Sequence, residues 1–392
     1  MNAPIVIVGA GQSGMKAAET LRSKGYDGDL VLYGDEHWLP YQRPPLSKAY
    51  LKGDMAEEQL YLRPDAYFEA QAIDFQMGAK VSELDVDARK ISLENGDELA
   101  YSKLLLATGT RACQIRLPGA DLDGVFTLRS MDDVAPLRGA LNTAEHIVII
   151  GAGYVGMEFA AVAAGMGKSV QVVEAQSRVL KRSVAPEISE YFQRLHTTNN
   201  VGLNFGVGVQ ALRGRGASVN AVLLSNGAEL KADLVLVAVG AVPVTELAEA
   251  SGLDVAAGII VDDACRTSAP NIFSAGDCCF FPSRRYGRRI RLESVQNAID
   301  QAKAAASAIL GEVVAYDPVP WFWSDQYDSK LQIAGLSEGY DRTQLEGDLD
   351  SGSFSLSYFS GDRLLAVDAI NAPRAHMIAR KTLAQPSSAE AA

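Results

Sequence analysis

Apolar runs and helix-forming stretches alternate along much of the chain. A β-branched run from Ile5 to Gly9 ends in a glycine turn, and the pattern then predicts a helix from Gln12 to Lys24 and a strand from Leu30 to Tyr33. The same order recurs later as a strand from His146 to Ile150, a helix from Tyr154 to Met166 and a strand from Ser169 to Glu174. Each strand–helix–strand unit is typical of the start of a doubly wound parallel sheet.

Other apolar runs extend this picture. Three of them end at small-residue turns and predict further buried strands: Lys103 to Leu106, Leu234 to Val239 and Asn271 to Ser274. Towards the C-terminus, Ser353 to Phe359 and Leu364 to Ile370 alternate in polarity around a Ser-Gly-Asp turn, which indicates a hairpin. We expect a separate α+β domain there, beginning with Trp321-Phe322-Trp323, and a frayed end over 384–392.

The first glycine turn has the pattern of a dinucleotide-binding fingerprint, with glycines at Gly9, Gly11 and Gly14. The first permits the tight turn, the second lets the backbone approach a pyrophosphate, and the third allows close packing of helix on strand. The free N–H groups of the helix start attract phosphate. Asp35 and Glu36 follow the second strand, where an acid accepts ribose hydroxyls.

The second turn repeats the fingerprint with Gly151, Gly153 and Gly156, and Glu174 ends its second strand. A carboxylate there accepts both ribose hydroxyls and repels a 2′-phosphate, so the sequence favours NADH. NADPH is not excluded, because Arg178, Lys181 and Arg182 follow nearby. One of the two fingerprints could also be a packing turn only.

Composition narrows the classes of function. The formal net charge is −12, which works against binding of nucleic acid and of anionic membranes. No apolar run reaches the roughly eighteen residues that span a bilayer, and the first residues lack the basic start of a signal peptide, so we expect a cytoplasmic protein.

The cysteines bear on the chemistry. There are four, with no CxxC or CxxxxC pair, and we interpret them as free buried thiols. The stretch from Asp35 to Gly53 contains none, which excludes the dithiol relay of disulfide reductases. No metal site is expected.

Several longer runs resemble one family over nearly the whole chain. The chain is similar to the FAD-dependent ferredoxin–NAD(+) reductases of bacterial oxygenase systems, the putidaredoxin reductase and biphenyl dioxygenase reductase type. Besides the two fingerprints, the most discriminating runs are Pro44-Pro45-Leu46-Ser47-Lys48 and Trp321-Phe322-Trp323-Ser324-Asp325-Gln326-Tyr327.

The resemblance implies an α/β fold with two doubly wound dinucleotide-binding domains, as in glutathione reductase, and a C-terminal α+β interface domain. The FAD-binding domain would be discontinuous, over 1–110 and 241–318. The NAD-binding domain would cover 111–240 and the interface domain 319–392.

The resemblance also implies roles for particular residues. Lys48, Glu158 and Trp323 would be catalytic, with Lys48 near the flavin and able to pair with Glu158. As bare sequence features they are a surface lysine, a helical glutamate and a core aromatic. The predicted FAD contacts are Gly9, Gly11, Ser13, Gly14, Asp35, Glu36, Lys48, Val81, Thr108, Gly109, Arg129, Gly276, Asp277, Val295 and Trp323. The predicted NAD contacts are Gly151, Gly153, Tyr154, Val155, Gly156, Glu158, Glu174 and Gly240.

The implied activity is NADH-dependent reduction of a 2Fe-2S ferredoxin through tightly bound FAD, in the service of a haem monooxygenase or a Rieske dioxygenase. Arg284, Arg285, Arg288 and Arg289 form a dense basic run that could dock an acidic ferredoxin, or could be a solvated loop. Alternatives are an NADH oxidase, a rubredoxin reductase, or a redox-sensing binding protein like the apoptosis-inducing flavoproteins. The oligomeric state stays open.

Overall fold

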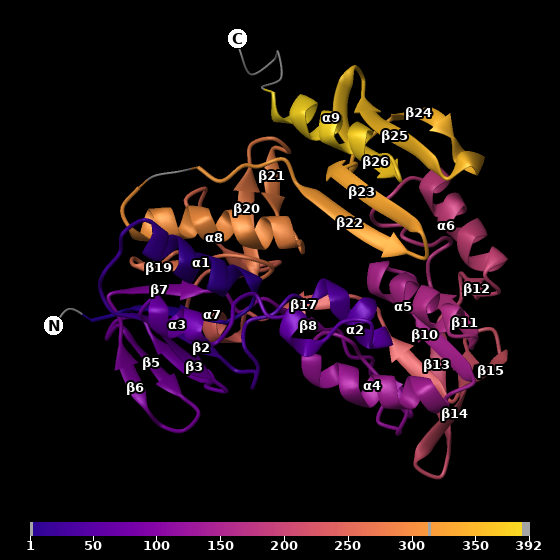
Figure 1. Cartoon of the computed structure of the whole chain (residues 1–392), viewed down its shortest axis with the longest axis horizontal. Coiled ribbons are helices and arrows are strands. Elements are labelled where there is room, and N and C mark those ends of the chain that lie inside the picture. The colour runs from indigo at the N-terminus through magenta and orange to yellow at the C-terminus, as the bar shows by residue number, and fades with distance from the viewer. Residues whose placement is uncertain (1–2, 313–314, 386–392) are drawn as a thin grey trace. The chain divides into compact units, whose positions relative to one another are not determined.

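The computed structural model describes residues 3–312 and 315–385, and the chain divides into two compact units (Figure 1). Each unit is assembled from three separate segments. The first contains Met1–Gln42, Glu57–Arg111 and Val242–Pro318; the second contains Arg43–Ala56, Ala112–Ala241 and Val319–Ala392. Most of the segment expected to be frayed, 386–392, lies outside the described residues.

The first unit is built around a parallel sheet. Its strand order is β19 (Ile272–Ser274), β7 (Lys103–Leu106), β1 (Ile5–Val8), β2 (Leu30–Gly34) and β3 (Ile73–Met77). The order reverses between β1 and β7, and a ligand site in such a sheet lies beyond the strand ends at that point. Helix α1 (Gln12–Ser23) begins there.

Both faces of this sheet are covered, which explains why β1 is an unbroken apolar run and why β2 and β7 are nearly so. Helix α1 packs against α8 (Val295–Ile309), and the two helices run side by side in Figure 1. Val6 and Leu104 instead join a core with Leu84 and Ile91 of a small antiparallel sheet. That sheet consists of β4 (Val81–Asp85), β5 (Lys90–Leu93) and β6 (Glu98–Ala100).

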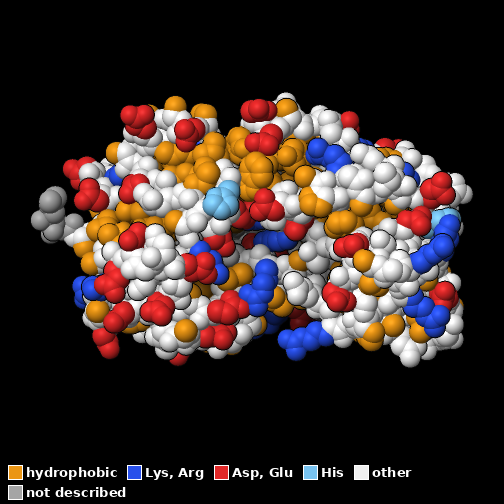
Figure 2. Space-filling model, turned by 90° about the horizontal axis from the view of Figure 1, so that it is seen from below, with side chains coloured by type: hydrophobic (Ala, Val, Ile, Leu, Met, Phe, Trp, Pro, Cys, Tyr) orange, Lys and Arg blue, Asp and Glu red, His pale blue; other side chains and the backbone are white. Residues whose placement is uncertain are grey.

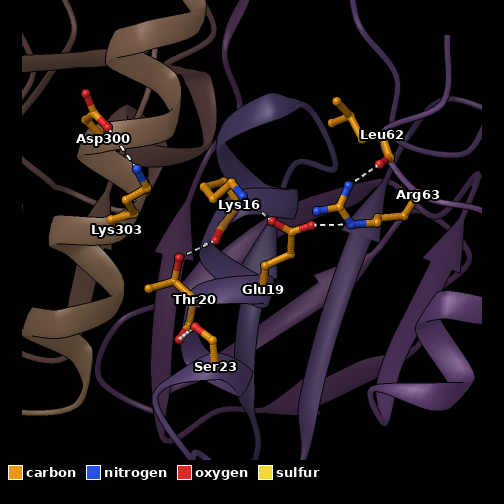
Figure 3. A network of polar contacts seen from close by, with 8 residues as sticks. All are labelled: Lys16, Glu19, Thr20, Ser23, Leu62, Arg63, Asp300 and Lys303. Atoms are coloured by element: carbon orange, nitrogen blue, oxygen red, sulfur yellow. Dashed lines mark hydrogen bonds and ion pairs between the residues drawn. The ribbon is translucent and has the colours of Figure 1, made fainter.

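Ion pairs attach a loop of this unit to α1 (Figure 3). The Arg63 Nε lies 2.7 Å from Oε1 of Glu19, whose other oxygen contacts the Lys16 amine. Arg63 also donates to the carbonyl oxygen of Leu62 over 2.7 Å. These contacts hold the loop against the helix whose first turn follows the first fingerprint.

The remaining elements of the first unit are short. They include η2 (Glu57–Gln59), α3 (Ala66–Ala70), α7 (Glu246–Ala250), β18 (Ile259–Ile260), β20 (Cys279–Ser283) and β21 (Arg288–Ile290). Strands β20 and β21 form an antiparallel hairpin. Its turn carries Arg284 and Arg285 and its second strand carries Arg288 and Arg289, the four arginines predicted as a docking surface.

The second unit contains another parallel sheet. Its order is β12 (Gly202–Phe205), β11 (Ser169–Glu174), β10 (His146–Ile150), β16 (Leu234–Val237) and β9 (Val125–Phe126). Helix α5 (Tyr154–Gly165) follows β10. The unit also contains η1 (Pro44–Ser47), α2 (Ala49–Lys52), α4 (Met131–Thr143), α6 (Pro186–Thr198) and an antiparallel sheet of β13 (Val209–Arg215), β14 (Ser218–Leu224) and β15 (Glu229–Lys231).

The C-terminal part of the second unit is an antiparallel sheet with one helix. The strands lie in the order β22 (Trp321–Gln326), β23 (Ser329–Gly335), β26 (Arg363–Ile370), β25 (Ser353–Ser360) and β24 (Arg342–Asp348). Helix α9 (Pro373–Ala384) packs on β23 and β26. The predicted hairpin is confirmed as β25 and β26.

The observed elements confirm the α/β fold with two doubly wound sheets and a C-terminal α+β part. Strands β7, β10 and β11 have the predicted bounds, whereas β16 ends at Val237, two residues earlier than predicted. The chain turns there towards Gly240, whose φ of +116° cannot continue a strand. On the face drawn in Figure 2, acidic side chains are spread with basic ones between them.

Candidate active site

The first fingerprint connects β1 to α1 through a turn that only glycines can form. Gly9 has a φ of +105°, and a Cβ there would clash with the carbonyl oxygen of Ala107. A Cβ on Gly14 would clash with the carbonyl oxygen of Gly9, so this glycine lets the helix lie close to the turn. A Cβ on Gly11 would meet nothing within 4 Å. The free N–H groups of the helix start therefore border open space.

The residues around this turn fit a bound FAD. Ser13 is buried, and among the described residues no group makes a hydrogen bond to its Oγ. A Cβ on Gly276 would lie 3.0 Å from the Ser13 Cβ, so the Gly276–Asp277 turn lies against the start of α1. A buried hydroxyl without a partner, beside free N–H groups and open space, suits a pyrophosphate.

The other FAD contacts predicted in the first unit have varied surroundings. Asp35 follows β2, and the next residue, Glu36, accepts a hydrogen bond from the Tyr41 hydroxyl. Val81 packs on the core of the first unit. Thr108 donates from Oγ1 to the carbonyl oxygen of Val244 over 2.6 Å, which fixes its loop.

Three of the predicted FAD contacts, Lys48, Arg129 and Trp323, belong to the second unit. Arg129 donates its backbone N–H to the Asp133 carboxylate over 2.7 Å, and its carbonyl oxygen accepts a bond from Arg43 over 2.8 Å. In the first unit, the predicted contact Val295 begins α8, and Gly109 accepts a hydrogen bond from the Val244 N–H over 2.9 Å.

The second fingerprint has the same geometry as the first. Gly151 has a φ of +105°, and a Cβ on Gly156 would clash with the Gly151 carbonyl oxygen. Gly153 again borders open space. Glu174 accepts N–H bonds from Ala152 over 2.7 Å and from Gln176 over 2.8 Å. The backbone therefore fixes this carboxylate beside the turn, where it fits the ribose of NADH.

Three basic residues kept NADPH as an alternative donor, and one of them, Arg178, is bonded to neighbouring groups of the second unit. Arg178 donates from Nη1 to the carbonyl oxygen of Val184 and to the Ser189 hydroxyl. It also donates from Nη2 to the carbonyl oxygen of Lys181. A Cβ on Gly240 would lie 3.7 Å from the Arg182 guanidinium. Arg182 is thus the basic residue that lies beside the predicted NAD contacts.

Helix α5 carries three further predicted NAD contacts. The ring centroid of Tyr154 lies 4.6 Å from that of Phe322, and burial raises the pKa of the Tyr154 hydroxyl. Val155 is exposed. Glu158 is buried one turn further along, with only 5% of its surface exposed.

Glu158 and Lys48 form an ion pair, as the resemblance implied. The Lys48 Nζ lies 2.8 Å from Oε1 of Glu158, and the Lys48 side chain is 21% exposed. Two hydroxyls complete the site, because Ser47 donates to Oε2 and Ser324 donates to Oε1, each over 2.7 Å. The carboxylate thus has three donors from η1, β22 and the residue that follows η1.

Sequence reasoning assigned no role to Ser47 and Ser324. Both residues lie in the runs that resemble the family, each directly beside a residue that was assigned a role. A serine alone is too common to indicate a role, so only those flanking runs could have indicated them.

Trp323 lies in β22 within an aromatic cluster and is half-buried. Its ring centroid is 5.8 Å from that of Trp321, over which the Arg380 guanidinium lies at 4.6 Å. The Trp323 ring centroid also lies 6.3 Å from that of Phe322, so the half-buried side chain is neither fully a core aromatic nor free.

The basic run of the first unit is partly tied internally. The Arg284 guanidinium lies 2.6 Å from the Asp263 carboxylate, and Arg289 donates to the Val261 carbonyl oxygen over 2.6 Å. Arg285 donates its backbone N–H to Asp317. Arg284, Arg288 and Arg289 nevertheless have exposed side chains.

The cysteine prediction is confirmed in its main point. Cys265, Cys278 and Cys279 are free and buried, and Cys113 is free and half-buried. Over 3–312 and 315–385, no cluster of three or more His, Cys, Asp or Glu could hold a metal ion.

Within the same residues, no helix has both the length and the apolar composition that a membrane span requires.

Known proteins resemble this chain over almost its full length. A model of the pyridine nucleotide-disulphide oxidoreductase family matches residues 3–302, and one described as reductase C-terminal matches 321–392. Rhodocoxin reductase of Rhodococcus erythropolis is 44% identical over 380 residues, which cover 97% of this chain and 89% of the relative. Putidaredoxin reductase of Pseudomonas putida is 40% identical, covering 95% and 89%.

A solved structure of a ferredoxin reductase also matches this chain over nearly its full length. The ferredoxin reductase for the CYP199A2 system from Rhodopseudomonas palustris superposes with a TM-score of 0.95 at 43% identity, covering 97% of this chain and 94% of that chain. The family uses FAD and NAD(H). With its two fingerprints, its Lys48–Glu158 pair and its C-terminal sheet, the chain belongs to the pyridine nucleotide-disulphide oxidoreductase family, among the flavin-dependent ferredoxin reductases.

Proposed function

We propose that this enzyme is an NADH-dependent ferredoxin reductase that supplies single electrons to a 2Fe-2S ferredoxin of an oxygenase system, whose terminal enzyme is a haem monooxygenase or a Rieske dioxygenase. The observation that carries the proposal is the ion pair between Lys48 and the buried Glu158, on the helix that begins within the second fingerprint. This pair supports a site that binds a nicotinamide. The chain has no cysteine between Asp35 and Gly53 that could act as a disulfide relay.

FAD, when bound, accepts two electrons as a hydride from NADH and releases them one at a time. The chain's own residues supply binding and electrostatics. Ser13 and the free N–H groups after Gly11 would hold the FAD pyrophosphate, and Asp35 the ribose. We assign these contacts to a FAD-binding domain over 1–110 and 241–318.

The second fingerprint would hold NADH in a domain over 111–240. Glu174 would accept the ribose hydroxyls, since backbone N–H groups already fix its orientation. Glu158 would orient the nicotinamide, and its three donors keep the carboxylate in place. The Lys48 ammonium would provide positive charge where negative charge develops during the transfer.

The acceptor is proposed from the relatives and from the surface. The rhodocoxin and putidaredoxin reductases are named for iron–sulfur or related redox partners, and one solved neighbour is a covalent putidaredoxin reductase–putidaredoxin complex. The hairpin that carries Arg284, Arg285, Arg288 and Arg289 would attract an acidic ferredoxin. Separately, we assign 319–392, which contains Trp323, to an interface domain. We place the protein in the cytoplasm, where NADH and ferredoxins are found.

The test is NADH-driven reduction of purified 2Fe-2S ferredoxins by the holoenzyme, with cytochrome c as the reporter. We expect reduction to depend on both the enzyme and a ferredoxin, and to be slower with NADPH. The E158Q variant should slow flavin reduction by NADH in stopped-flow, whereas the matched control K330M, at an exposed lysine of β23, should not.

Other outcomes would contradict the proposal. Rapid turnover with oxygen alone would indicate an NADH oxidase. Slow flavin reduction with a long-lived charge-transfer complex would indicate a redox-sensing binding protein. A rubredoxin reductase is the second candidate, because a rubredoxin–NAD(+) reductase of Pseudomonas putida is also 36% identical to this chain. Faster reduction of rubredoxin than of any ferredoxin would favour it.

A further inference from the structure

A row of buried hydrogen bonds leads from helix α6 to Glu158. His196 Nε2 lies 2.8 Å from the Gln326 Oε1, Gln326 Nε2 donates to Ser324 Oγ over 3.3 Å, and Ser324 Oγ donates to Glu158 Oε1 over 2.7 Å. His196, Gln326 and Ser324 are each 0% exposed. We propose that His196 and Gln326 are positioning residues of the active site, which act through Ser324 to hold the Glu158 carboxylate beside Lys48.

The protonation of His196 gives this row a direction. Burial lowers the pKa of His196 to about 4, so at neutral pH the ring has one N–H donor and one acceptor nitrogen. The Tyr327 hydroxyl lies 3.4 Å from His196 Nδ1, and burial raises the pKa of Tyr327 to about 12, so the hydroxyl keeps its hydrogen. The Gln326 oxygen that faces Nε2 can only accept, so Nε2 donates to it and Nδ1 is the acceptor that faces the Tyr327 hydroxyl.

The N–H of His196 fixes which end of the Gln326 amide faces Ser324. Only the carbonyl end of the amide can accept from His196 Nε2, so the NH₂ end faces the Ser324 oxygen. A reversed amide would present its carbonyl oxygen to Ser324 and compete with Glu158 for the Ser324 hydrogen. The N–H on His196 Nε2 therefore favours the arrangement in which Ser324 donates to Glu158.

Stability alone does not account for these residues. Three polar side chains without exposed surface must all be paired to avoid a desolvation cost, and apolar residues of similar volume commonly stabilise such a position as well or better. The row instead ends on the Glu158 carboxylate, which pairs with Lys48. Its hydrogen bonds therefore act on the position of that carboxylate. The inference rests on the proposed function only in assigning Glu158 a role with NADH. The positioning of Glu158 by the row does not depend on that role.

The test measures the Lys48 amine directly in the holoenzyme. N-hydroxysuccinimidyl acetate is added, and acetylation of Lys48 is followed over time by peptide mass spectrometry. Lys330 is the internal reference, because it lies on the neighbouring strand β23 and pairs with Asp325 at 3.6 Å. Local loosening of the β22–β23 hairpin would raise both rates together, whereas loss of positioning would raise the Lys48 rate alone.

The variants separate the links of the row. E158Q removes the anion and sets the upper limit for the Lys48 rate. Q326E keeps the shape but has no donor for Ser324, and H196F removes the N–H that fixes the amide. Both should raise the Lys48-to-Lys330 ratio about three- to tenfold, since a hydrogen bond to a charged group is redirected. H196Q, which retains a donor, should restore a ratio close to wild type.

S329A is the matched control, because Ser329 is a buried serine of β23 that contacts the Tyr191 hydroxyl and lies outside the row. It should leave the ratio unchanged. The inference is overturned if Q326E labels like the wild type while E158Q labels faster, or if Lys48 and Lys330 rise together. If H196F does not fold, Q326E and H196Q still decide the question.

Stopped-flow reduction of the flavin by NADH, run on the same samples, distinguishes this inference from the proposed function. A wild-type enzyme that NADH reduces, with unchanged labelling in Q326E, refutes the positioning role alone. A wild-type enzyme that NADH does not reduce refutes the proposed function, whatever the labelling ratio.

Discussion

The Lys48–Glu158 pair can be dissected with the variants K48M and E158Q and their combination. In K48M, a carboxylate that is 5% exposed keeps two hydroxyl donors but loses its counter-charge, which should lower the free energy of unfolding by about 2–3 kcal/mol. In E158Q the Lys48 side chain, 21% exposed, can turn to water, so the loss should be about 1 kcal/mol.

The double variant leaves neither charge unpaired. We therefore expect it to lose about 2 kcal/mol less than the sum of the single variants, since interacting residues are not additive. Urea unfolding of the holoenzyme, followed by tryptophan fluorescence, measures this coupling. Two of the three tryptophans, Trp321 and Trp323, belong to the same unit as the pair.

The pair of Lys330 and Asp325, whose side chains are more exposed, provides the control cycle, with K330M and D325N. Its atoms lie 3.6 Å apart and its side chains are 56% and 34% exposed, so its coupling should be at most about 1 kcal/mol. If the coupling between Lys48 and Glu158 were no larger than in this control cycle, the reasoning from burial would be refuted.

Four further predictions follow from the site and from two buried groups. E174A should lower kcat/KM for NADH about tenfold and that for NADPH less, because the lost carboxylate favours the unphosphorylated ribose; steady-state kinetics with both donors measure the ratio. R284A/R288A should raise the apparent KM for ferredoxin and weaken its salt dependence while ferricyanide reduction is kept, and unchanged ferredoxin kinetics would exclude this docking surface. Burial raises the pKa of Asp368 from 3.8 to about 7, so stability should fall by about 4 kcal/mol as the pH rises from 4 through 7, and D368N should remove this fall in urea unfolding at several pH values. Burial lowers the pKa of His196 from 6.5 to about 4, so stability should fall as the pH drops from 6.5 through 4, and H196Q should abolish that loss.

The sequence predicted the two parallel sheets well, because a strand buried on both faces must be an apolar run and its turn must contain glycine. The run from His146 to Ile150 and the φ of Gly151 are the clearest cases. The end of β16 could not be predicted, since Ala238 and Val239 are as apolar as the strand and the turn depends on contacts with Gly151.

The site residues also differ in how far the sequence alone could predict them. The fingerprint glycines and Glu174 follow from local spacing, whereas the Lys48–Glu158 pair joins residues 110 positions apart and was implied only by resemblance. Ser47 and Gln326 carry no local signal, because their importance depends on a buried carboxylate that another element supplies. The grouping of residues 43–56 with the second unit likewise depends on long-range contacts.

The alternation of the two units along the chain has a consequence for biosynthesis. The central sheet of the first unit needs β19, at Ile272–Ser274, to cover the edge of β7, and the second unit needs strands beyond residue 320. A nascent chain that ends before these segments has unpaired strand edges, which invite association with other chains. Neither unit can be completed early on the ribosome, because the first needs its segment up to Pro318 and the second needs the C-terminal sheet.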